Sequence, residues 1–359
     1  MRTKEELTED LKKMALTLGA FKVGVVTTAT LKGGPPSVDL GYVLPGARSA
    51  VCFALAFDQS LIESYFRKED HKSLETDKVR TTTLANGIAL EIAEFLQQQG
   101  CRALPIGANF VYRQEGDNWM MDMHPPLSHR YLAARSGVGH FGYSGNIITQ
   151  EYGSAIVLAS VVTDAELLPT EPLPEAENYC DECRLCLSVC ASGYVDPKEK
   201  VSVNLGGREF SYGKRRSNSR CYLVCGGLSG LDRSGEWSTW SPARFEIPDK
   251  EEGFLATIPG ATEAYLKRPK FEGGFFICLI EGSRMEYTCS NCHFVCHPDK
   301  KVRAARYRML REGGVVIEDA DGNRRAVSPE EARDYIAKLT KERSNLYKAG
   351  EKELTSEKS

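Results

Sequence analysis

The chain has 359 residues, 42% of them hydrophobic and 26% charged, and a formal net charge of −3 at pH 7. A chain of this length is expected to form two or three hydrophobic cores rather than one. The small net charge gives no overall attraction to nucleic acid or anionic lipid, and no stretch approaches the ~20 apolar residues of a membrane-spanning helix. The N-terminal segment shows neither a secretory core nor a twin arginine, so a cytoplasmic protein is expected.

The N-terminal segment predicts one helix followed by two buried strands. Residues 3–6 form a capping box, and apolar residues at helical spacing continue up to Gly19, so a first helix is expected here. The runs 21–26 and 50–57 are short, rich in Val, Phe and Ala, and bounded by turn residues. Such runs are typical of buried strands.

Helices and strands are predicted to alternate beyond this point. Leu, Ile and Phe residues line one face of a long helix over 78–99, and a strand is expected over 109–112. A short helix is predicted near 127–135, followed by hydrophobic strands at 146–149 and 154–162. This alternation favours an α/β arrangement.

Glycines crowd the segment that follows the short predicted helix. They are Gly137, Gly139, Gly142 and Gly145. Such a density of glycine lets the backbone approach a flat or bulky group closely. The formal Gly-x-Gly-x-x-Gly pattern could also indicate a phosphate loop, but it follows a helix rather than a strand and lacks a P-loop lysine. Phosphate binding is therefore the weaker interpretation.

A proline-marked linker at 169–174 leads into the most informative motif of the chain. Four cysteines have the spacing by which a bacterial ferredoxin-type loop binds a [4Fe-4S] cluster, with the fourth cysteine reaching a second cluster. They are Cys180, Cys183, Cys186 and Cys190. A partner motif consists of Cys289, Cys292 and Cys296. The pair predicts two interlocked clusters, whose oxygen sensitivity suggests an anaerobic or low-oxygen host.

Two such clusters need eight thiolates, and the two motifs supply seven. The eighth ligand is expected from Cys221, Cys225 or Cys278; Cys221 is preferred, and Cys278 lies in an apolar run typical of a packed thiol. The preferred assignment gives one cluster Cys180, Cys183, Cys186 and Cys296. It gives the other cluster Cys190, Cys221, Cys289 and Cys292.

Two other uses of the cysteines are weaker. Structural zinc sites also use Cys-x-x-Cys pairs, but zinc does not need the interlocked last cysteine of both motifs. A disulfide framework is disfavoured in a long chain without a secretory segment. Cys52 and Cys101 lie in apolar runs, where a buried free thiol is ordinary.

The stretch 198–288 is longer than a ferredoxin needs between its two motifs. Trp237 and Trp240 within it are expected to pack in a core, and an insertion of this size could also enclose a substrate cavity. Both interpretations stay open.

The C-terminal segment predicts a hairpin, a helix and a tail. Residues 315–327 resemble a hairpin that turns at 321–322, and Ser328 is expected to cap a charged amphipathic helix. A solvated tail is expected from Lys348 onwards.

The cysteine motifs occur together with a second distinctive segment, Pro126 to Gly142, which contains Arg130 and the spaced glycines. In these features the chain resembles the cobalamin-dependent epoxyqueuosine reductases and their relatives, the reductive dehalogenases. The likeness also covers 42–51 and 149–153. The resemblance implies an α+β fold class: a nitroreductase-like α/β corrinoid-binding domain followed by a ferredoxin-like domain with two [4Fe-4S] clusters.

The resemblance also implies boundaries and cofactors. The corrinoid domain is expected over 1–168, the ferredoxin-like domain over 169–300 with its insertion at 198–288, and a C-terminal hairpin, helix and tail over 301–359. Two [4Fe-4S] clusters and a base-off cobalamin between the domains are the expected cofactors. Iron–sulfur clusters reach the low potentials that reduction of cobalt requires.

Individual site residues follow from the same resemblance. The predicted cobalamin contacts are Arg130, Gly137, Gly139, His140, Gly142 and Ser144, the glycines leaving room for a planar macrocycle. Epoxyqueuosine reductases carry an acid where this chain has Met123. The proton donor is therefore expected among Tyr143, His124 and Asp122.

The predicted function is a corrinoid-dependent iron–sulfur reductase that passes electrons from a ferredoxin or flavodoxin to cobalamin and on to a small organic substrate. tRNA is expected to be an unlikely partner, because the acid is missing at Met123, the net charge is slightly negative and no basic extension is visible. The alternatives are an epoxyqueuosine reductase acting on tRNA, or a non-catalytic protein that reactivates a corrinoid partner.

Overall fold

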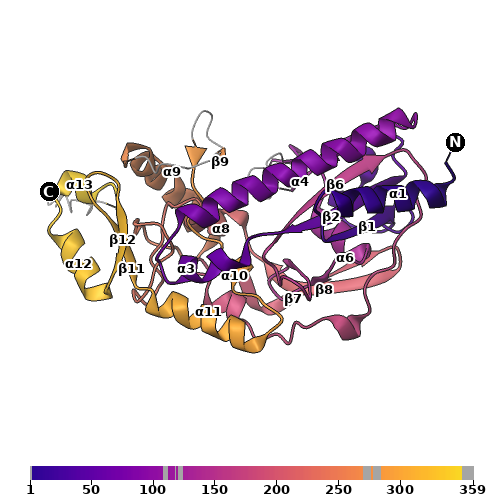
Figure 1. Cartoon of the computed structure of the whole chain (residues 1–359). Coiled ribbons are helices and arrows are strands. Elements are labelled where there is room, and N and C mark those ends of the chain that lie inside the picture. Colours follow the sequence, from indigo (N-terminus) through magenta and orange to yellow (C-terminus); the bar gives the residue numbers. More distant parts are fainter. Residues whose placement is uncertain are drawn as a thin grey trace.

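The structure is a computed structural model that describes residues 2–107, 112–117, 119, 124–269, 276–277 and 284–349. Its N-terminal part is built on a four-stranded sheet, and the cysteine motifs lie beside that sheet among short helices (Figure 1). The long helix α4 (Lys72–Gln98) extends from the sheet to the cysteine-rich part (Figure 1).

The sheet is antiparallel throughout. Its strands lie in the order β1 (Lys22–Thr27), β2 (Ser49–Ala56), β6 (Ile156–Thr163) and β3 (Ala103–Ile106). Cys52 of β2 lies opposite Gly24 on one side and Ser160 on the other. The predicted α/β alternation is therefore wrong for this sheet, because the order of helices and strands along a chain does not by itself set strand direction. The mixed helix-and-strand class is confirmed.

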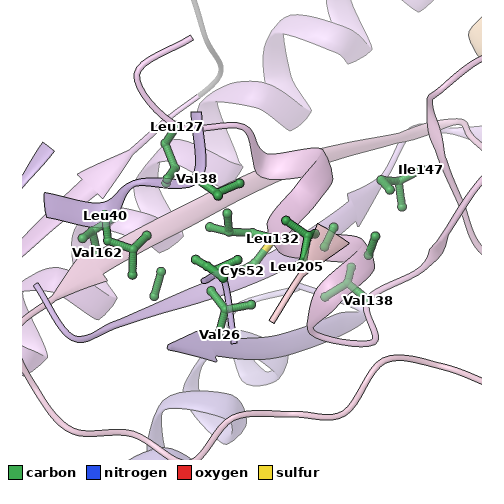
Figure 2. Close-up of a cluster of buried hydrophobic side chains, with 14 of the residues drawn as sticks. Val26, Val38, Leu40, Cys52, Leu127, Leu132, Val138, Ile147, Val162 and Leu205 are labelled. Atoms are coloured by element: carbon green, nitrogen blue, oxygen red, sulfur yellow. The ribbon is translucent and has the colours of Figure 1, made fainter. Parts of the chain in front are cut away.

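Helices and a hairpin cover both faces of the sheet. They are α1 (Lys4–Thr17), α4, α6 (His129–Arg135) and the hairpin of β7 (Val195–Leu205) and β8 (Arg208–Arg215). Val51 and Phe53 of β2 pack with α1 and α4, whereas Cys52 packs with α6 and the hairpin (Figure 2). Alternate residues of β2 thus enter two different cores, which explains its continuous apolar sequence.

The β7–β8 hairpin was not predicted from the sequence. Gly206 and Gly207 form its turn with φ of 60° and 84°, a left-handed conformation that glycine adopts without strain. Leu205 and Tyr212 of the hairpin are buried in the same cluster as Leu132 of α6 (Figure 2). The insertion therefore supplies part of the core of the N-terminal part.

Several short elements connect the larger ones, and Ile62, Tyr65 and Phe66 of one of them pack in the same cluster as Phe294. The short elements are the 3-10 helices η1 (Pro36–Val38), η2 (Gln59–Leu61) and η3 (Glu175–Glu177), the helices α2 (Leu40–Val43) and α3 (Ile62–Phe66), and the strands β4 (His140–Phe141) and β5 (Ile147–Ile148).

The cysteine-rich part consists mainly of helices. They are α7 (Leu185–Ser188), α8 (Asn218–Cys225), α9 (Glu251–Lys267), α10 (Asn291–Phe294) and α11 (Lys300–Glu312), with the short pair β9 (Phe276–Ile277) and β10 (Arg284–Met285). Trp237 and Trp240 are buried in one cluster with Phe294. Core packing of both tryptophans is therefore confirmed.

The C-terminal hairpin and helix are also confirmed. The elements are β11 (Val315–Glu318), β12 (Arg324–Val327), α12 (Pro329–Ala337) and α13 (Lys341–Ser344). Gly322 has a φ of 90° in the turn, and the Ser328 hydroxyl accepts a 3.1 Å hydrogen bond from Glu331 N–H. The predicted tail beyond residue 349 lies outside the described residues.

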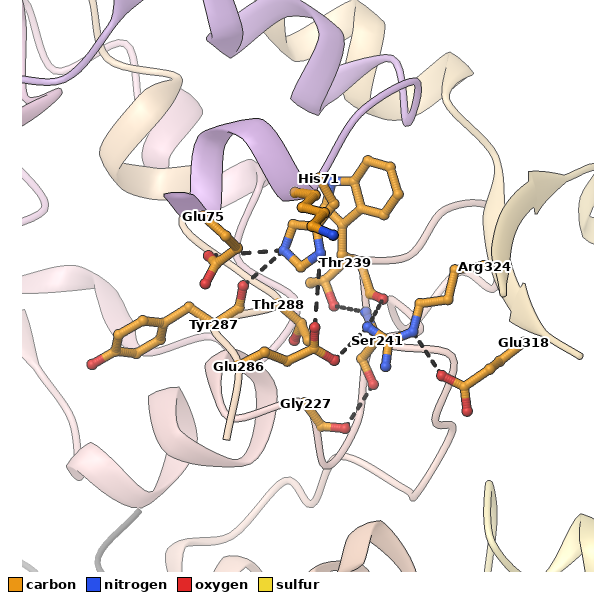
Figure 3. A network of polar contacts seen from close by, with 12 residues as sticks. His71, Glu75, Gly227, Thr239, Ser241, Glu286, Tyr287, Thr288, Glu318 and Arg324 are labelled. Carbon is orange, nitrogen blue, oxygen red and sulfur yellow. Dashed lines mark hydrogen bonds and ion pairs between the residues drawn. The ribbon is translucent and has the colours of Figure 1, made fainter. Parts of the chain in front are cut away.

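A buried polar network links all three predicted segments (Figure 3). Arg324 of β12 forms an ion pair with Glu286 and another, at 2.7 Å, with Glu318. His71, next to the start of α4, stacks on Trp240 with 4.9 Å between ring centroids and lies 3.8 Å from Glu286. The segments on either side of the predicted boundaries at residues 168 and 300 therefore share one buried interior.

Element boundaries differ from prediction at several places. The capping box is confirmed, with hydrogen bonds of 3.2 Å and 2.9 Å between Thr3 and Glu6. Helix α4 begins at Lys72 rather than at residue 78. The strand before the short helix is β3, and residues 109–111 of the predicted strand lie outside the described residues. Within the described ranges, every helix is too short or too polar to span a lipid bilayer.

Candidate metal centre

The cysteines of the two motifs gather into two groups. Burial and, to a smaller extent, the nearby charges of Cys296, Cys180 and Cys183 raise the pKa of Cys186 to about 12. We call these four cysteines the first thiol group. Burial likewise raises the pKa of Cys292, and the charges of Cys190, Cys221, Cys289 and, least of all, Cys186 add to the effect. We call Cys190, Cys221, Cys289 and Cys292 the second thiol group. These charge effects indicate that cysteines of each group lie near one another, and the assignment of the two groups as cluster ligands stays a prediction.

The loop around the first thiol group has an unusual backbone. Glu182 and Arg184, which flank Cys183, have φ of 52° and 59°, a left-handed conformation that non-glycine residues seldom adopt. Cys183 itself is exposed. The left-handed residues let the chain turn sharply on both sides of Cys183.

Hydrogen bonds reach the sulfur atoms from outside the motifs. The backbone N–H of Tyr143 donates to Cys180 Sγ at 3.3 Å, and the N–H of Tyr194 donates to Cys190 Sγ at 3.4 Å. Tyr179 Oη lies 3.3 Å from Cys296 Sγ. Donors of this kind favour the thiolate form and tune the reduction potential of a bound cluster.

The donors at both groups are thiols, the ligand type of [4Fe-4S] clusters. In the part of the chain that the structure describes, no three His, Cys, Asp or Glu side chains converge closely enough to hold a single metal ion. Ligation of two clusters by the eight cysteines stays a prediction.

Two of the candidates for the eighth ligand lie side by side. Cys221 and Cys225 are four residues apart on α8, so they share one helix face. A hydrogen bond between their side chains, together with burial, raises the pKa of Cys221. Cys221 also acts electrostatically on Cys289 and Cys292. Cys278 lies outside the described residues.

The glycine-rich segment is packed against the protein itself. A Cβ at Gly137 would lie 2.5 Å from the Glu171 carbonyl oxygen, and one at Gly139 would lie 2.6 Å from the Ile148 carbonyl oxygen. A Cβ at Gly142 would lie 3.0 Å from Ile148. Neighbouring backbone and side chains thus fill the space that a side chain would take at these glycines, and their contact with a planar macrocycle stays a prediction.

The β8 strand contacts the same segment directly. Arg215 Nε donates to the Ser144 carbonyl oxygen at 3.0 Å, and a Cβ at Gly145 would lie 2.8 Å from the Tyr212 ring. Arg130 Nη1 donates to the Gly145 carbonyl oxygen at 2.6 Å. The predicted cofactor contacts Arg130 and Ser144 thus lie beside the hairpin, and their role toward a cofactor stays a prediction.

The remaining predicted site residues have different surroundings. Tyr143 is 4% exposed, and its hydroxyl donates to the Asp196 carbonyl oxygen at 3.2 Å. His124 is exposed, and Asp122 and Met123 lie outside the described residues. His140 is buried, burial lowers its pKa, and its Nε2 has no hydrogen-bond partner among the described residues. The choice of proton donor among Tyr143, His124 and Asp122, and the contact of His140 with a cofactor, stay predictions.

Sequence reasoning missed an arginine–tyrosine cluster beside the second thiol group. It consists of Arg130, Tyr131, Tyr194, Tyr212 and Arg215. The Tyr131 and Tyr212 hydroxyls are 2.7 Å apart, and the Arg215 guanidinium lies 5.6 Å from the centre of the Tyr194 ring. The charges of Cys221 and Arg130 both act on Tyr194. The residues come from α6 and from the unpredicted hairpin, so no local sequence pattern could reveal the cluster.

No protein-family model matches the chain. It is 26% identical over 221 residues to an epoxyqueuosine reductase from Gloeobacter violaceus, a match that covers 52% of this chain and 60% of that protein. The chain thus spans less than two thirds of the length of this relative. A solved catabolic reductive dehalogenase has a similar fold, with a TM-score of 0.50 and 14% identity over 86% of this chain and 36% of that one. The resemblance to epoxyqueuosine reductases and reductive dehalogenases is confirmed.

The expectation that tRNA is an unlikely partner is wrong. The curated relatives from Gloeobacter violaceus and Bacillus subtilis are both epoxyqueuosine reductases, the class of enzyme that this expectation set aside. A net charge near zero was a poor guide, because phosphate contacts depend on local cations rather than on the total charge.

Proposed function

We propose that this chain, a relative of the epoxyqueuosine reductases and reductive dehalogenases, is an iron–sulfur reductase that removes the oxygen of an epoxide carried by tRNA. The observation that supports it best is the pair of thiol groups, the second of which borders a cationic and aromatic cluster. A nucleotide bound at the arginine–tyrosine cluster lies next to the source of electrons in the second cluster. The main sequence interpretation, a small organic substrate, has less support than this alternative.

The two clusters match the electron count of the reaction. Converting an epoxide to an alkene breaks both C–O bonds, forms a C=C bond and releases the oxygen as water, which consumes two electrons and two protons. A [4Fe-4S] cluster transfers one electron at a time. Two reduced clusters therefore hold the two electrons that one turnover consumes.

The two thiol groups have different surroundings, which suggests a direction for electron flow. The first group contains the exposed Cys183, a point at which a ferredoxin or flavodoxin can dock. The second group lies beside the arginine–tyrosine cluster. We propose that electrons enter at the first cluster and leave from the second.

The resemblance also predicts a base-off corrinoid, which would supply a strongly nucleophilic reduced cobalt. The predicted contact glycines do not fit this group as a flat cradle, because protein atoms occupy the space above Gly137, Gly139 and Gly142. Corrinoid binding stays a prediction of the resemblance, and no step of the proposal depends on it.

The test uses anaerobically reconstituted full-length protein, reduced flavodoxin and tRNA that carries the epoxide nucleoside. Mass spectrometry of the digested tRNA is expected to show loss of one oxygen atom from that nucleoside. Cys292→Ser, which removes a ligand of the second cluster, should abolish the conversion. A protein with both clusters intact that leaves the tRNA unchanged but reduces a corrinoid protein would contradict the proposal and favour the reactivation function.

A further inference from the structure

Two arginines from distant parts of the chain converge on one turn of the backbone. Arg130 lies on α6, and Arg215 ends β8. Arg130 Nη1 donates to the Gly145 carbonyl oxygen at 2.6 Å, while Arg215 donates to the Ser144 carbonyl oxygen at 3.0 Å and to Asn146 Oδ1 at 2.7 Å. All three acceptors are neutral, so the turn orients both guanidinium groups without neutralising them.

Neither arginine is paired with a carboxylate among the described residues. Their neighbours along the chain behave differently: Arg216 forms an ion pair with Asp196 at 2.9 Å, and Arg220 forms one with Glu251 at 2.6 Å. Burial and the positive charge of Arg215 together lower the pKa of Arg130 to about 10. Two positive charges thus lie close together in a partly desolvated environment. A bound anion would reduce the repulsion between them.

Several N–H groups of the pair are still available to a ligand. Arg130 Nε and Nη2, and Arg215 Nη1, make no hydrogen bond to any described residue. Guanidinium groups present planar sets of donors that match the oxygens of a phosphate. Two of them side by side can hold the two free oxygens of a phosphodiester.

Tyrosine rings border the two guanidinium groups. The Arg130 guanidinium lies 5.6 Å from the centre of the Tyr131 ring and 5.7 Å from that of Tyr212, and Tyr194 lies beside Arg215. Aromatic rings next to a phosphate site are typical of sites that bind unpaired nucleotides, because each base offers a face for stacking.

We infer that Arg130 and Arg215 form an anion site that binds a phosphodiester group of the ligand beside the second cluster. This inference rests on the proposed function, in which the ligand is a nucleotide of tRNA. The nucleotide tail of a corrinoid carries the same chemical group and is the second possible source. Arg215 belongs to the insertion, so the site depends on the β7–β8 hairpin.

The experiment compares full-length reconstituted protein with the variants Arg130→Gln and Arg215→Gln. Arg208→Gln is the matched control, because Arg208 lies on the same strand but is exposed and pairs with Glu171. Binding of an anticodon stem-loop RNA is measured over a range of salt concentrations, with inorganic phosphate as competitor. Each site variant should bind the RNA about tenfold more weakly. The slope of log binding constant against log salt concentration should be smaller by about one, whereas the control should bind like the unaltered protein.

A second arm identifies the source of the phosphate. Binding of cobalamin is compared with that of cobinamide, which lacks the nucleotide tail. If the variants lose affinity for cobalamin alone, while cobinamide and RNA bind normally, the anion site is supported and its phosphate belongs to the corrinoid. If RNA and both corrinoids bind to the variants as to the unaltered protein, the inference is wrong.

Iron and sulfide analysis separates a third outcome. The two arginines could instead compensate the negative charge of the second cluster, since Arg215 lowers the pKa of Cys221. Variants that lose iron but bind RNA and corrinoids normally would overturn the inference in favour of that role. A failure of the proposed function looks different, because the unaltered protein would then leave the tRNA epoxide unchanged whatever the variants do.

Discussion

The backbone N–H of Gly213 donates a 2.8 Å hydrogen bond to the carbonyl oxygen of Tyr143. The N–H of Tyr143 in turn donates to Cys180 Sγ at 3.3 Å. One peptide segment therefore connects the insertion hairpin to the first thiol group. The hairpin contributes to the metal centre as well as to the hydrophobic core.

This connection can be tested at Gly213. A Cβ at this position would lie 2.7 Å from the Tyr143 carbonyl oxygen and 2.7 Å from its ring. We expect Gly213→Ala to destabilise the fold by about 1–3 kcal/mol through overpacking, as measured by thermal unfolding of the reconstituted protein. Ser211→Ala, at an exposed position of the same strand, should change the stability little. Equal melting temperatures for the two variants would contradict this close contact.

The reconstituted protein should contain about eight irons and eight sulfides, because each thiol group is expected to hold one [4Fe-4S] cluster. Cys186→Ser should remove the first cluster and Cys292→Ser the second, each leaving about half of the iron. Metal and sulfide analysis together with EPR of the reduced protein gives the measurement. Bound zinc without sulfide would instead indicate structural metal sites.

The eighth ligand is expected to be Cys221 rather than Cys225. The charge of Cys221 acts on Cys289 and Cys292, whereas the charge of Cys225 acts on Tyr112 and Tyr287. We expect Cys221→Ser to lose or alter the EPR signal of the second cluster, while Cys225→Ser keeps about eight irons. Loss of the signal only in Cys225→Ser would reverse the assignment.

Stability should fall as the pH decreases from about 6.5 to about 4, partly because of His129. Burial lowers the pKa of this histidine to about 4, and its ring nitrogens lie 2.8 Å from Ser160 Oγ and from the Gly107 carbonyl oxygen. Below pH 6.5 the unfolded chain binds a proton that the folded chain does not, so folding is penalised by up to about 3 kcal/mol. Denaturant unfolding at several pH values should show a shallower pH dependence in His129→Asn. An unchanged dependence would rule out His129 as its source.

The buried ion pairs of Arg324 should be essential to the fold. Glu286 and Glu318 are both 1% exposed in their side chains, so Arg324→Ala would leave two buried carboxylates without this cation. We expect a loss of about 3–5 kcal/mol in unfolding free energy. The adjacent Arg325 is exposed and pairs with Glu331, so Arg325→Ala should cost less than about 1 kcal/mol. Similar losses in both variants would show that burial of the Arg324 pairs is unimportant.

Much of the local structure could be predicted because it depends on neighbours in the chain. The Thr3 capping box, the turn at Gly322 and the cap at Ser328 each involve residues only a few positions apart. The Cys-x-x-Cys spacings are local in the same sense, and the two sets of four cluster ligands inferred with their help stay a prediction. Residues that are close along the chain have few alternative local conformations, so a short sequence pattern is enough to predict them.

The sequence by itself determined the buried strands and the C-terminal hairpin, since apolar runs and turn residues leave few alternatives. Only the tertiary structure decided the direction of the strands, the packing above the glycines and the meeting of Arg130 with Arg215. These features join residues that are far apart along the chain, and the loop-closure entropy that opposes such contacts is overcome only when the whole core forms. The hairpin that carries Arg215 has an alternating sequence of mostly polar residues, which gains a buried face only because the sheet and α6 lie beneath it.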